Sequence, residues 1–98
     1  MAQDPVQAAP NVYRVLFEND RVRLLEARMS PGTDAAMHRH PDYLMYSLSD
    51  GRVTFSSPSG ERAEVELRTG EVTWRDTEEH ATENTGGTAV AALLFEFK

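Results

Sequence analysis

The chain contains three histidines, His38, His40 and His80, and their spacing allows all of them to share one metal site. Residues i and i+2 of a β-strand project from the same face, so a strand through His38 and His40 presents both imidazoles together. His80 can complete the set from another strand. Three imidazoles suit a transition ion and leave coordination positions free for water, dioxygen or a substrate. The histidines therefore indicate an open metal site that can do chemistry.

Composition excludes several other kinds of function. The 98 residues suffice for one small domain, and a net charge of -6 argues against binding to nucleic acids or membrane surfaces, which requires a concentrated positive patch. The chain has no cysteine, which excludes disulfides, a thiolate nucleophile and a zinc-thiolate site. Any metal must therefore be held by nitrogen and oxygen atoms.

The N-terminal region has a different character from the rest of the chain. Residues 1–11 contain Pro5 and Pro10 and no periodic pattern, so we expect a flexible tail lying over a domain that spans residues 12–98. No stretch is apolar enough to predict a transmembrane helix or a signal peptide. Residues 2–7 nevertheless resemble the start of a mature secreted chain. Two locations therefore stay open: the cytoplasm, and the periplasm or exterior if a leader was removed.

Turn-forming residues recur at short intervals from Val12 onward, which is typical of an antiparallel all-β barrel or sandwich. The segments between the turns mostly alternate apolar with polar residues, and none shows a helical period of useful length. We expect strands over residues 13–18, 22–29, 36–40, 43–48, 52–56, 63–67, 71–75, 80–84 and 89–97. Such a chain can close into a barrel of about eight strands, with room inside for packed side chains or one small ligand.

The segment Val90 to Phe95 is nearly continuous in apolar character, as in a strand that is buried on both faces. A contact with a second subunit would cover the outer face of this strand. The pattern therefore favours a homodimer.

Two spaced motifs in this all-β chain resemble those of a small single-domain cupin. The first family motif reads Gly, five residues, His, one residue, His, three or four residues, Glu, six residues, Gly. Its spacings are matched by Gly32, His38, His40, Leu44 and Gly51. The second motif is matched by Gly70, His80 and Asn84, although the segment between Gly70 and His80 departs from the family pattern.

The resemblance implies a jelly-roll-like antiparallel barrel in which His38, His40 and His80 bind the metal. Leu44 stands where the family has a glutamate ligand, so the chain resembles the three-histidine cupins, some of which are iron-dependent dioxygenases. It is most similar to short bacterial cupins labelled as β-alanine degradation proteins, through segments such as Phe17 to Arg23. The implied cofactor is a divalent first-row metal, with Fe(II) favoured and Zn, Ni, Mn or Cu as alternatives.

Side-chain alternation counted through the Pro41-Asp42 turn places Leu44 on the inner face of the barrel, together with Tyr46. We therefore expect these two residues to roof a pocket beside the metal. The Tyr46 phenol is the candidate catalytic group, because it could donate a hydrogen bond or a proton to a bound substrate. Trp74 is a further candidate for the pocket lining.

Polar residues near the motifs have more than one interpretation. Asn84 is expected either to hydrogen-bond the barrel backbone or to orient a ligand from behind the histidines. Glu26, Glu78 and Glu79 are candidates to replace the missing carboxylate ligand, although the run that contains Glu78 and Glu79 is typical of a solvated loop.

The sequence thus favours a small-molecule metalloenzyme of oxygenase type, without a nucleic-acid or membrane partner. The alternative, from a different functional class, is a non-catalytic module that binds a metal or a small ligand and serves in sensing or storage.

Overall fold

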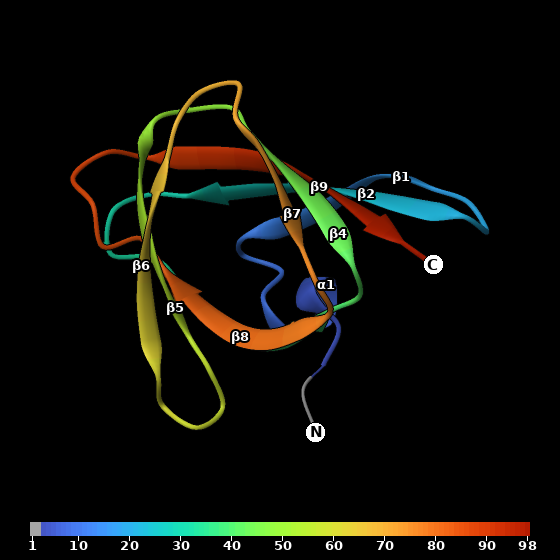
Figure 1. Cartoon of the computed structure of the whole chain (residues 1–98), viewed down its shortest axis with the longest axis horizontal. Coiled ribbons are helices and arrows are strands. Elements are labelled where there is room, and N and C mark those ends of the chain that lie inside the picture. The colour runs from blue at the N-terminus through green and yellow to red at the C-terminus, as the bar shows by residue number, and fades with distance from the viewer. Residues whose placement is uncertain (1–2) are drawn as a thin grey trace.

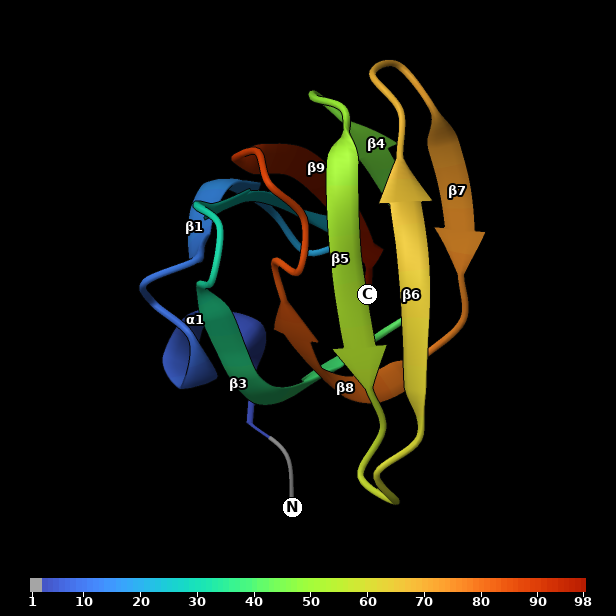
Figure 2. The same cartoon turned by 90° about the vertical axis from the view of Figure 1, so that its left-hand side faces the viewer.

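The computed structural model describes residues 3–98, and most of these residues lie in two antiparallel β-sheets that face each other (Figures 1 and 2). The elements are α1 Pro5–Ala8, β1 Tyr13–Glu18, β2 Val22–Met29, β3 Asp34–His40, β4 Tyr43–Ser47, β5 Gly51–Ser56, β6 Arg62–Leu67, β7 Val72–Arg75, β8 Glu78–Glu83 and β9 Val90–Phe97. The all-β prediction is confirmed, and each strand begins and ends within two residues of its predicted position.

The order of the strands brings the histidine-bearing segments together. One sheet has the order β1-β2-β9-β4-β7 and the other has the order β3-β8-β5-β6. The chain passes from one sheet to the other after β2, β3, β4, β6, β7 and β8. As a result β3 and β8 pair in one sheet, while β4 and β9 pair in the other. Side chains from all four strands can therefore meet between the sheets.

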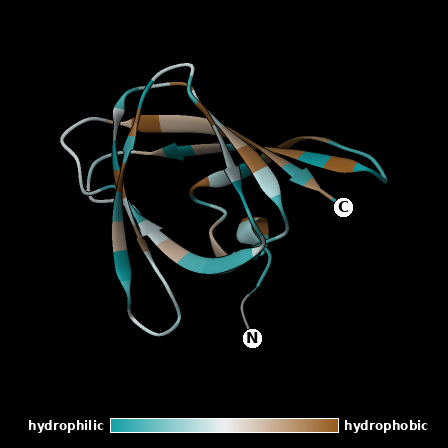
Figure 3. Cartoon of the chain, in the orientation of Figure 1, coloured by the Kyte–Doolittle hydropathy of each residue, from teal (hydrophilic) through white to brown (hydrophobic). Residues whose placement is uncertain are grey.

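The hydrophobic core fills the space between the two sheets. Alternation buries every second residue of β9, beginning with Val90, while the residues between them are only partly covered. On β6, Glu64 and Glu66 are exposed while Leu67 is buried, as the strict alternation of this segment predicts. The positions of β4 and β9 that are not buried also carry apolar residues, including Leu44, Leu93 and Phe95. Figure 3 shows hydrophobic colour along much of β9 and part of β4. The outer face of the five-stranded sheet is therefore less polar than alternation alone would require.

Residues 3–11 contact the strands and include a helix, α1, which the sequence pattern did not predict. Asp4 caps α1 by accepting a hydrogen bond from the Val6 amide at 3.0 Å, and Pro5 occupies the first turn, where its missing N–H costs nothing. The carbonyl of Gln3 accepts a hydrogen bond from the Arg39 amide at 2.9 Å, and Ala9 is buried. Within residues 3–98, no helix is long and apolar enough to cross a membrane.

Candidate metal centre

The three histidines converge between the sheets, as the sequence predicted. His38 and His80 are direct partners in the pairing of β3 with β8, and His40 follows two residues further along β3. The ring centroids lie 4.7 Å apart for His38 and His40, 4.8 Å for His38 and His80, and 5.1 Å for His40 and His80. One potential ligand nitrogen from each ring lies within 4.8 Å of the others, and no ring is more than 3% exposed.

The pairing of β3 with β8 is irregular just before His38. The register of β3 against β8 shifts between Ala35 and His38, and bulges commonly re-aim a side chain next to a functional site. The Ala36 carbonyl can only accept a hydrogen bond, so the Nδ1 atom of His38 donates to it at 2.6 Å. The Nε2 atom therefore faces the interior, where the Tyr13 hydroxyl donates to it at 3.1 Å.

A buried carboxylate holds His40. The Nδ1 atom of His40 donates to Glu96 Oε2 at 2.7 Å, and Glu96 Oε1 accepts two hydrogen bonds from Arg23 at 2.8 and 2.9 Å. Arg23 also binds Asp4 of the N-terminal segment. A carboxylate behind a metal-binding histidine fixes the tautomer and makes the other nitrogen a better ligand. His40 Nε2 is thereby turned toward the other two rings.

Sequence analysis missed Glu96, although a signal for it was present. Alternation along β9 places Glu96 on the same face as Leu94 and Ala92, which form part of the core. A single acidic residue on a buried face requires a cationic or hydrogen-bonding partner, because burial of an unpaired carboxylate is costly. His40 is 56 residues away in the chain, so the pattern could show the need for a partner but not its identity.

His80 stacks on an aromatic ring and lies beside a second carboxylate. The Phe55 ring lies parallel to it, with centroids 4.5 Å apart and an angle of 8° between the planes, and the Arg75 guanidinium lies 4.5 Å from the Phe55 centroid. Glu78 Oε1 lies 3.4 Å from His80 Nδ1. The Glu78 carboxylate also accepts hydrogen bonds from Arg75 and, at 2.7 Å, from the Tyr43 hydroxyl. Glu78 therefore stands beside Nδ1 and is already engaged by other partners.

The buried groups have shifted pKa values that favour neutral imidazoles. Burial lowers the pKa of His38 to about 4, and it also lowers the pKa of His80, because an imidazolium loses its hydration there. Burial alone would raise the pKa of Glu78, but hydrogen bonding, chiefly with Arg75, outweighs it and holds that pKa well below its ordinary value. Burial raises the pKa of Tyr13, so its phenol stays protonated. Neutral imidazole is the form that binds metal ions.

The free nitrogen atoms fit a metal ion. His40 Nε2 and both ring nitrogens of His80 are buried, and none of them has a hydrogen-bond partner among residues 3–98. Unpaired buried polar atoms cost free energy, and coordination of an ion by Nε2 atoms would compensate for that cost. Three neutral imidazoles are a suitable donor set for divalent first-row metals. The observed residues are therefore compatible with the implied cofactor.

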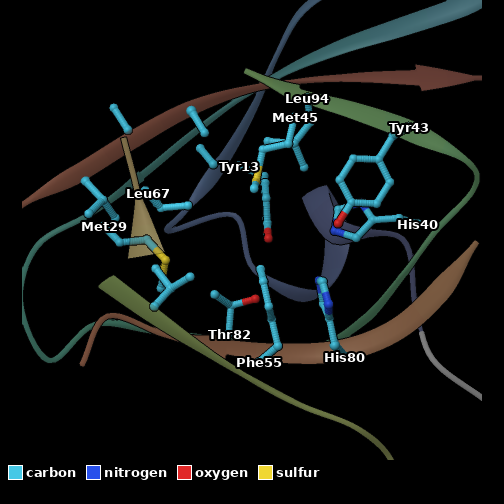
Figure 4. Close-up of a pocket in the computed structure, with 15 residues that line it drawn as sticks. Tyr13, Met29, His40, Tyr43, Met45, Phe55, Leu67, His80, Thr82 and Leu94 are labelled. Atoms are coloured by element: carbon cyan, nitrogen blue, oxygen red, sulfur yellow. The ribbon is translucent and has the colours of Figure 1, made fainter. Parts of the chain in front are cut away.

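A cavity of about 40 Å³ adjoins His40 and His80. Its walls are mainly apolar and include Met29, Met45, Val53, Phe55, Leu67 and Leu94. Figure 4 shows the Tyr13 hydroxyl pointing into the space between the sheets. A single water molecule needs about 10–15 Å³ of such volume, so the cavity has room for a ligand of only a few non-hydrogen atoms.

The expected inward orientation of Leu44 and Tyr46 is wrong. Both project from the outer face of β4, and Tyr46 is 37% exposed. Tyr43 and Met45 are the residues of β4 that point inward and line the cavity. The count failed because the chain passes to the opposite sheet between His40 and Tyr43, and this crossing reverses the alternation. The Tyr46 phenol therefore lies outside the cavity.

Two other candidates also lie away from the cavity. Trp74 is 53% exposed on β7 and stacks on Phe97 with ring centroids 5.8 Å apart, so its predicted place in the pocket lining is wrong. Asn84 is buried, and its amide donates to the carbonyls of Met29 at 3.0 Å and Thr88 at 2.9 Å. This contact with the barrel backbone confirms the first of the two interpretations of Asn84.

The remaining carboxylate candidates do not join the histidine cluster. Glu26 lies in ion pairs with Arg14 and Arg28, each at 3.2 Å. Glu79 is adjacent to His80 in β8 and therefore projects from the opposite face of the strand. Among the three glutamates, Glu78 alone reaches the cluster, and it does so on the Nδ1 side of His80.

Solved structures with related architecture are similar to this chain over most of its length. A cupin domain from Bordetella pertussis aligns with a TM-score of 0.81 and 27% identity, covering 100% of this chain and 98% of that one. An RmlC-like cupin family protein from Methanocaldococcus jannaschii aligns with a TM-score of 0.70 and 11% identity, covering 88% and 78%. A protein with a double-stranded β-helix domain from Klebsiella pneumoniae gives a TM-score of 0.69 and 17% identity, covering 86% and 73%.

A curated relative is similar over a shorter range. The beta-alanine degradation protein BauB of Pseudomonas aeruginosa is 37% identical over 57 residues, which correspond to 57% of this chain and 57% of that protein. The aligned segment thus spans little more than half of the relative. No protein-family profile matches the chain.

Proposed function

Because this chain has the cupin fold, we propose that it is a metal-dependent enzyme of oxygenase type that acts on a small molecule. The observation that supports the proposal most strongly is the buried cluster of His38, His40 and His80, in which nitrogen atoms lack partners among residues 3–98. These residues would hold a divalent first-row ion, with Fe(II) favoured. Such an ion supplies Lewis acidity and reactivity toward dioxygen.

The surrounding residues of the chain would prepare the site before a ligand arrives. The Ala36 carbonyl and the Glu96 carboxylate hold the Nδ1 protons of His38 and His40, which commits the Nε2 atoms to the metal. Imidazole ligands add no negative charge, so a divalent ion held by these residues would keep its full charge. This favours an anionic or bidentate oxygen ligand in the cavity.

Tyr13 is the hydroxyl donor placed to contact that ligand. Its oxygen lies 3.1 Å from His38 Nε2, and it would lose this acceptor once Nε2 binds a metal. The hydroxyl could then donate to an oxygen atom of the bound molecule. Since burial raises the pKa of Tyr13, the phenol would act as a hydrogen-bond donor and not as a base. The apolar wall that includes Met45 and Phe55 would exclude water.

The small size of the cavity also supports the second candidate, a non-catalytic module that binds a metal or a small ligand. About 40 Å³ accommodates dioxygen or a small carboxylate more readily than a drug-sized substrate. The name of the Pseudomonas aeruginosa relative makes β-alanine and related small carboxylates reasonable test ligands. In this second function the bound molecule would leave unchanged.

Metal analysis of protein purified without chelators or nickel resin tests the first requirement of both functions. We expect about one first-row metal ion per chain, and we expect its loss when His38, His40 and His80 are replaced by alanine. A metal-free wild-type protein that also fails to bind added Fe(II), Zn(II) or Ni(II) would contradict the proposed site.

Oxygen uptake distinguishes the two functions. The Fe(II)-loaded protein is mixed under air with diketones, thiols, aromatic diols and small carboxylates including β-alanine, and dissolved oxygen and products are followed. The enzyme proposal requires uptake that depends on one substrate class and disappears in the alanine variant. Tight metal binding without turnover across the panel would support the binding module.

A further inference from the structure

Thr82 places a buried hydroxyl group beside the histidine cluster. It lies on β8 two residues after His80, so both side chains project from the same face of the strand. Thr82 is 5% exposed and lines the cavity that adjoins His80. Its Oγ1 atom has no hydrogen-bond partner among residues 3–98. A polar atom that is free to bind a ligand therefore borders the cavity.

Packing does not explain a hydroxyl at this position. Thr82 pairs with Phe55 of β5 and Ala35 of β3, which are both buried and apolar. Valine has nearly the same volume as threonine, and burial of a hydroxyl without a partner costs free energy. Thr54 on β5 is a useful comparison, because it is also buried but its Oγ1 lies 2.9 Å from that of Thr85. The Thr82 hydroxyl thus requires another role.

A second hydroxyl reaches the same space from the opposite sheet. Figure 4 shows the oxygen atoms of Tyr13 and Thr82 both pointing into the space between the sheets. Burial raises the pKa of Tyr13, and the nearby Thr82 hydroxyl partly offsets this rise. If His38 Nε2 binds a metal, the Tyr13 hydroxyl loses its present acceptor. Both hydroxyls can then donate to one oxygen atom of a ligand.

The rest of the cavity offers nothing to a cationic group. Its lining contains no aspartate, glutamate, lysine or arginine among residues 3–98. Of the carboxylates beside the histidines, Glu78 is paired with Arg75. Glu96 is paired with Arg23. A ligand ammonium group would therefore be buried without a counter-ion, which is costly.

We propose that Tyr13 and Thr82 form an oxygen-binding subsite that selects short monocarboxylates with an apolar tail and rejects their amino derivatives. The inference rests on the proposed function, because the metal ion would bind one carboxylate oxygen and the two hydroxyls would bind the other. The cavity of about 40 Å³ offers about three water-sized positions, which suits a ligand of about two or three carbons. Met45 and Leu94 are among the apolar residues that would contact the tail.

Propionate and β-alanine are a matched pair of probes for this selectivity. β-Alanine is propionate with an added amino group, which is an ammonium at pH 7. Calorimetric titration of the Zn(II)-loaded protein measures both affinities without turnover, since Zn(II) has no redox chemistry. Wild type should bind propionate at least about 100-fold more tightly than β-alanine, because the cavity leaves an ammonium unpaired.

Thr82→Val tests the contribution of the hydroxyl. A hydrogen bond to a charged group is worth roughly 10–100-fold in affinity, so this variant should bind propionate about 10-fold more weakly or worse. Zn(II) affinity should stay at the wild-type value. The metal-free variant should melt at or above the temperature of wild type, since a buried hydroxyl without a partner is removed. A merely structural role for Thr82 would not give this combination.

Two further variants serve as controls. Thr82→Ser keeps the hydroxyl and should bind propionate nearly as well as wild type. Thr54→Val makes the same change at a buried threonine that does not line the cavity, so its propionate affinity should equal that of wild type.

Several outcomes overturn the inference while metal binding by the histidines stands. One is equal propionate affinity of Thr82→Val and wild type, and another is β-alanine binding as tight as that of propionate. A Zn(II)-loaded wild type that binds neither probe has the same consequence. The comparison of the two probes needs only wild type, so it decides the selectivity even where a variant fails to fold. A wild type that takes up no metal overturns the proposed function and this inference with it.

Discussion

Glu96 accepts a hydrogen bond from Nδ1 of His40 at 2.7 Å, and both side chains are almost completely buried. Glu96 is in turn bound by Arg23, which also contacts Asp4. A line of charged groups thus runs from the N-terminal segment to one of the candidate metal ligands. The orientation of His40 depends on residues that would not touch the metal.

Glu96→Gln should weaken metal binding by about 10–100-fold, because an amide oxygen is a weaker acceptor for the His40 proton than a carboxylate. Competition against a coloured chelator measures the change. Glu66→Gln is the control, since Glu66 is exposed on β6 and should leave affinity unchanged. Equal affinity of Glu96→Gln and wild type would show that the carboxylate does not tune His40.

Met45→Glu should create a carboxylate that can reach the histidine cluster. Met45 points into the cavity, whereas Leu44 points outward. Without metal, the buried carboxylate should lower the melting temperature, because an unpaired buried charge is costly. Added metal should restore much of the stability and shift metal preference toward ions that favour oxygen ligands.

Leu44→Glu is the matched control for Met45→Glu, because it makes the same chemical change one residue earlier in the strand. Its metal preference should equal that of wild type. A shift in Leu44→Glu, with none in Met45→Glu, would mean that the orientation of β4 is the reverse of the one described here.

Tyr13→Phe should reduce turnover or ligand affinity at the proposed site by removing the hydroxyl that lies 3.1 Å from His38 Nε2. Loss of one hydrogen bond costs about 1 kcal/mol, so the variant should still fold. Steady-state kinetics, or ligand titration of the metal-loaded protein, provides the measurement. Tyr46→Phe removes a hydroxyl outside the cavity and should behave as wild type; the opposite ranking would assign the active phenol to Tyr46.

Asp4→Asn should lower stability by about 1 kcal/mol at neutral pH, since the carboxylate caps α1 and binds Arg23. Burial alone would raise the pKa of Asp4, but hydrogen bonding and attraction from Arg23 outweigh it and lower that pKa. A lowered carboxyl pKa means that the unfolded chain binds the proton more readily. The stabilisation that the Asp4 carboxylate provides is therefore present above about pH 4. It is lost as the pH falls through the pKa of Asp4 in the folded state.

Urea unfolding of both proteins at a series of pH values measures this contribution. The difference between wild type and Asp4→Asn should shrink as the solution becomes acidic. A difference that stays constant from pH 7 to pH 2, or one that grows, would show that the ionised carboxylate is not the source of the stabilisation.

The sequence by itself determined where the strands lie and that two candidate metal ligands, His38 and His40, share one face of a strand. Turn residues and alternation are local properties, so strand positions could be predicted closely, and the two-residue spacing of His38 and His40 placed both on one face. His80, which both the set of three histidines and the cupin resemblance predicted as their partner, lies in the same cluster.

Tertiary structure alone decided which other side chains surround the candidate metal centre. The passage between sheets before Tyr43 reversed the alternation, so Met45 and not Leu44 lines the cavity, and no local pattern records such a crossing. Glu96 meets His40 across 56 residues of sequence. Apolar side chains from Trp74 to Phe17 line up across the outer face of the five-stranded sheet only because its strands pair in one register. These relationships depend on long-range packing, which brings together residues that are far apart in the chain.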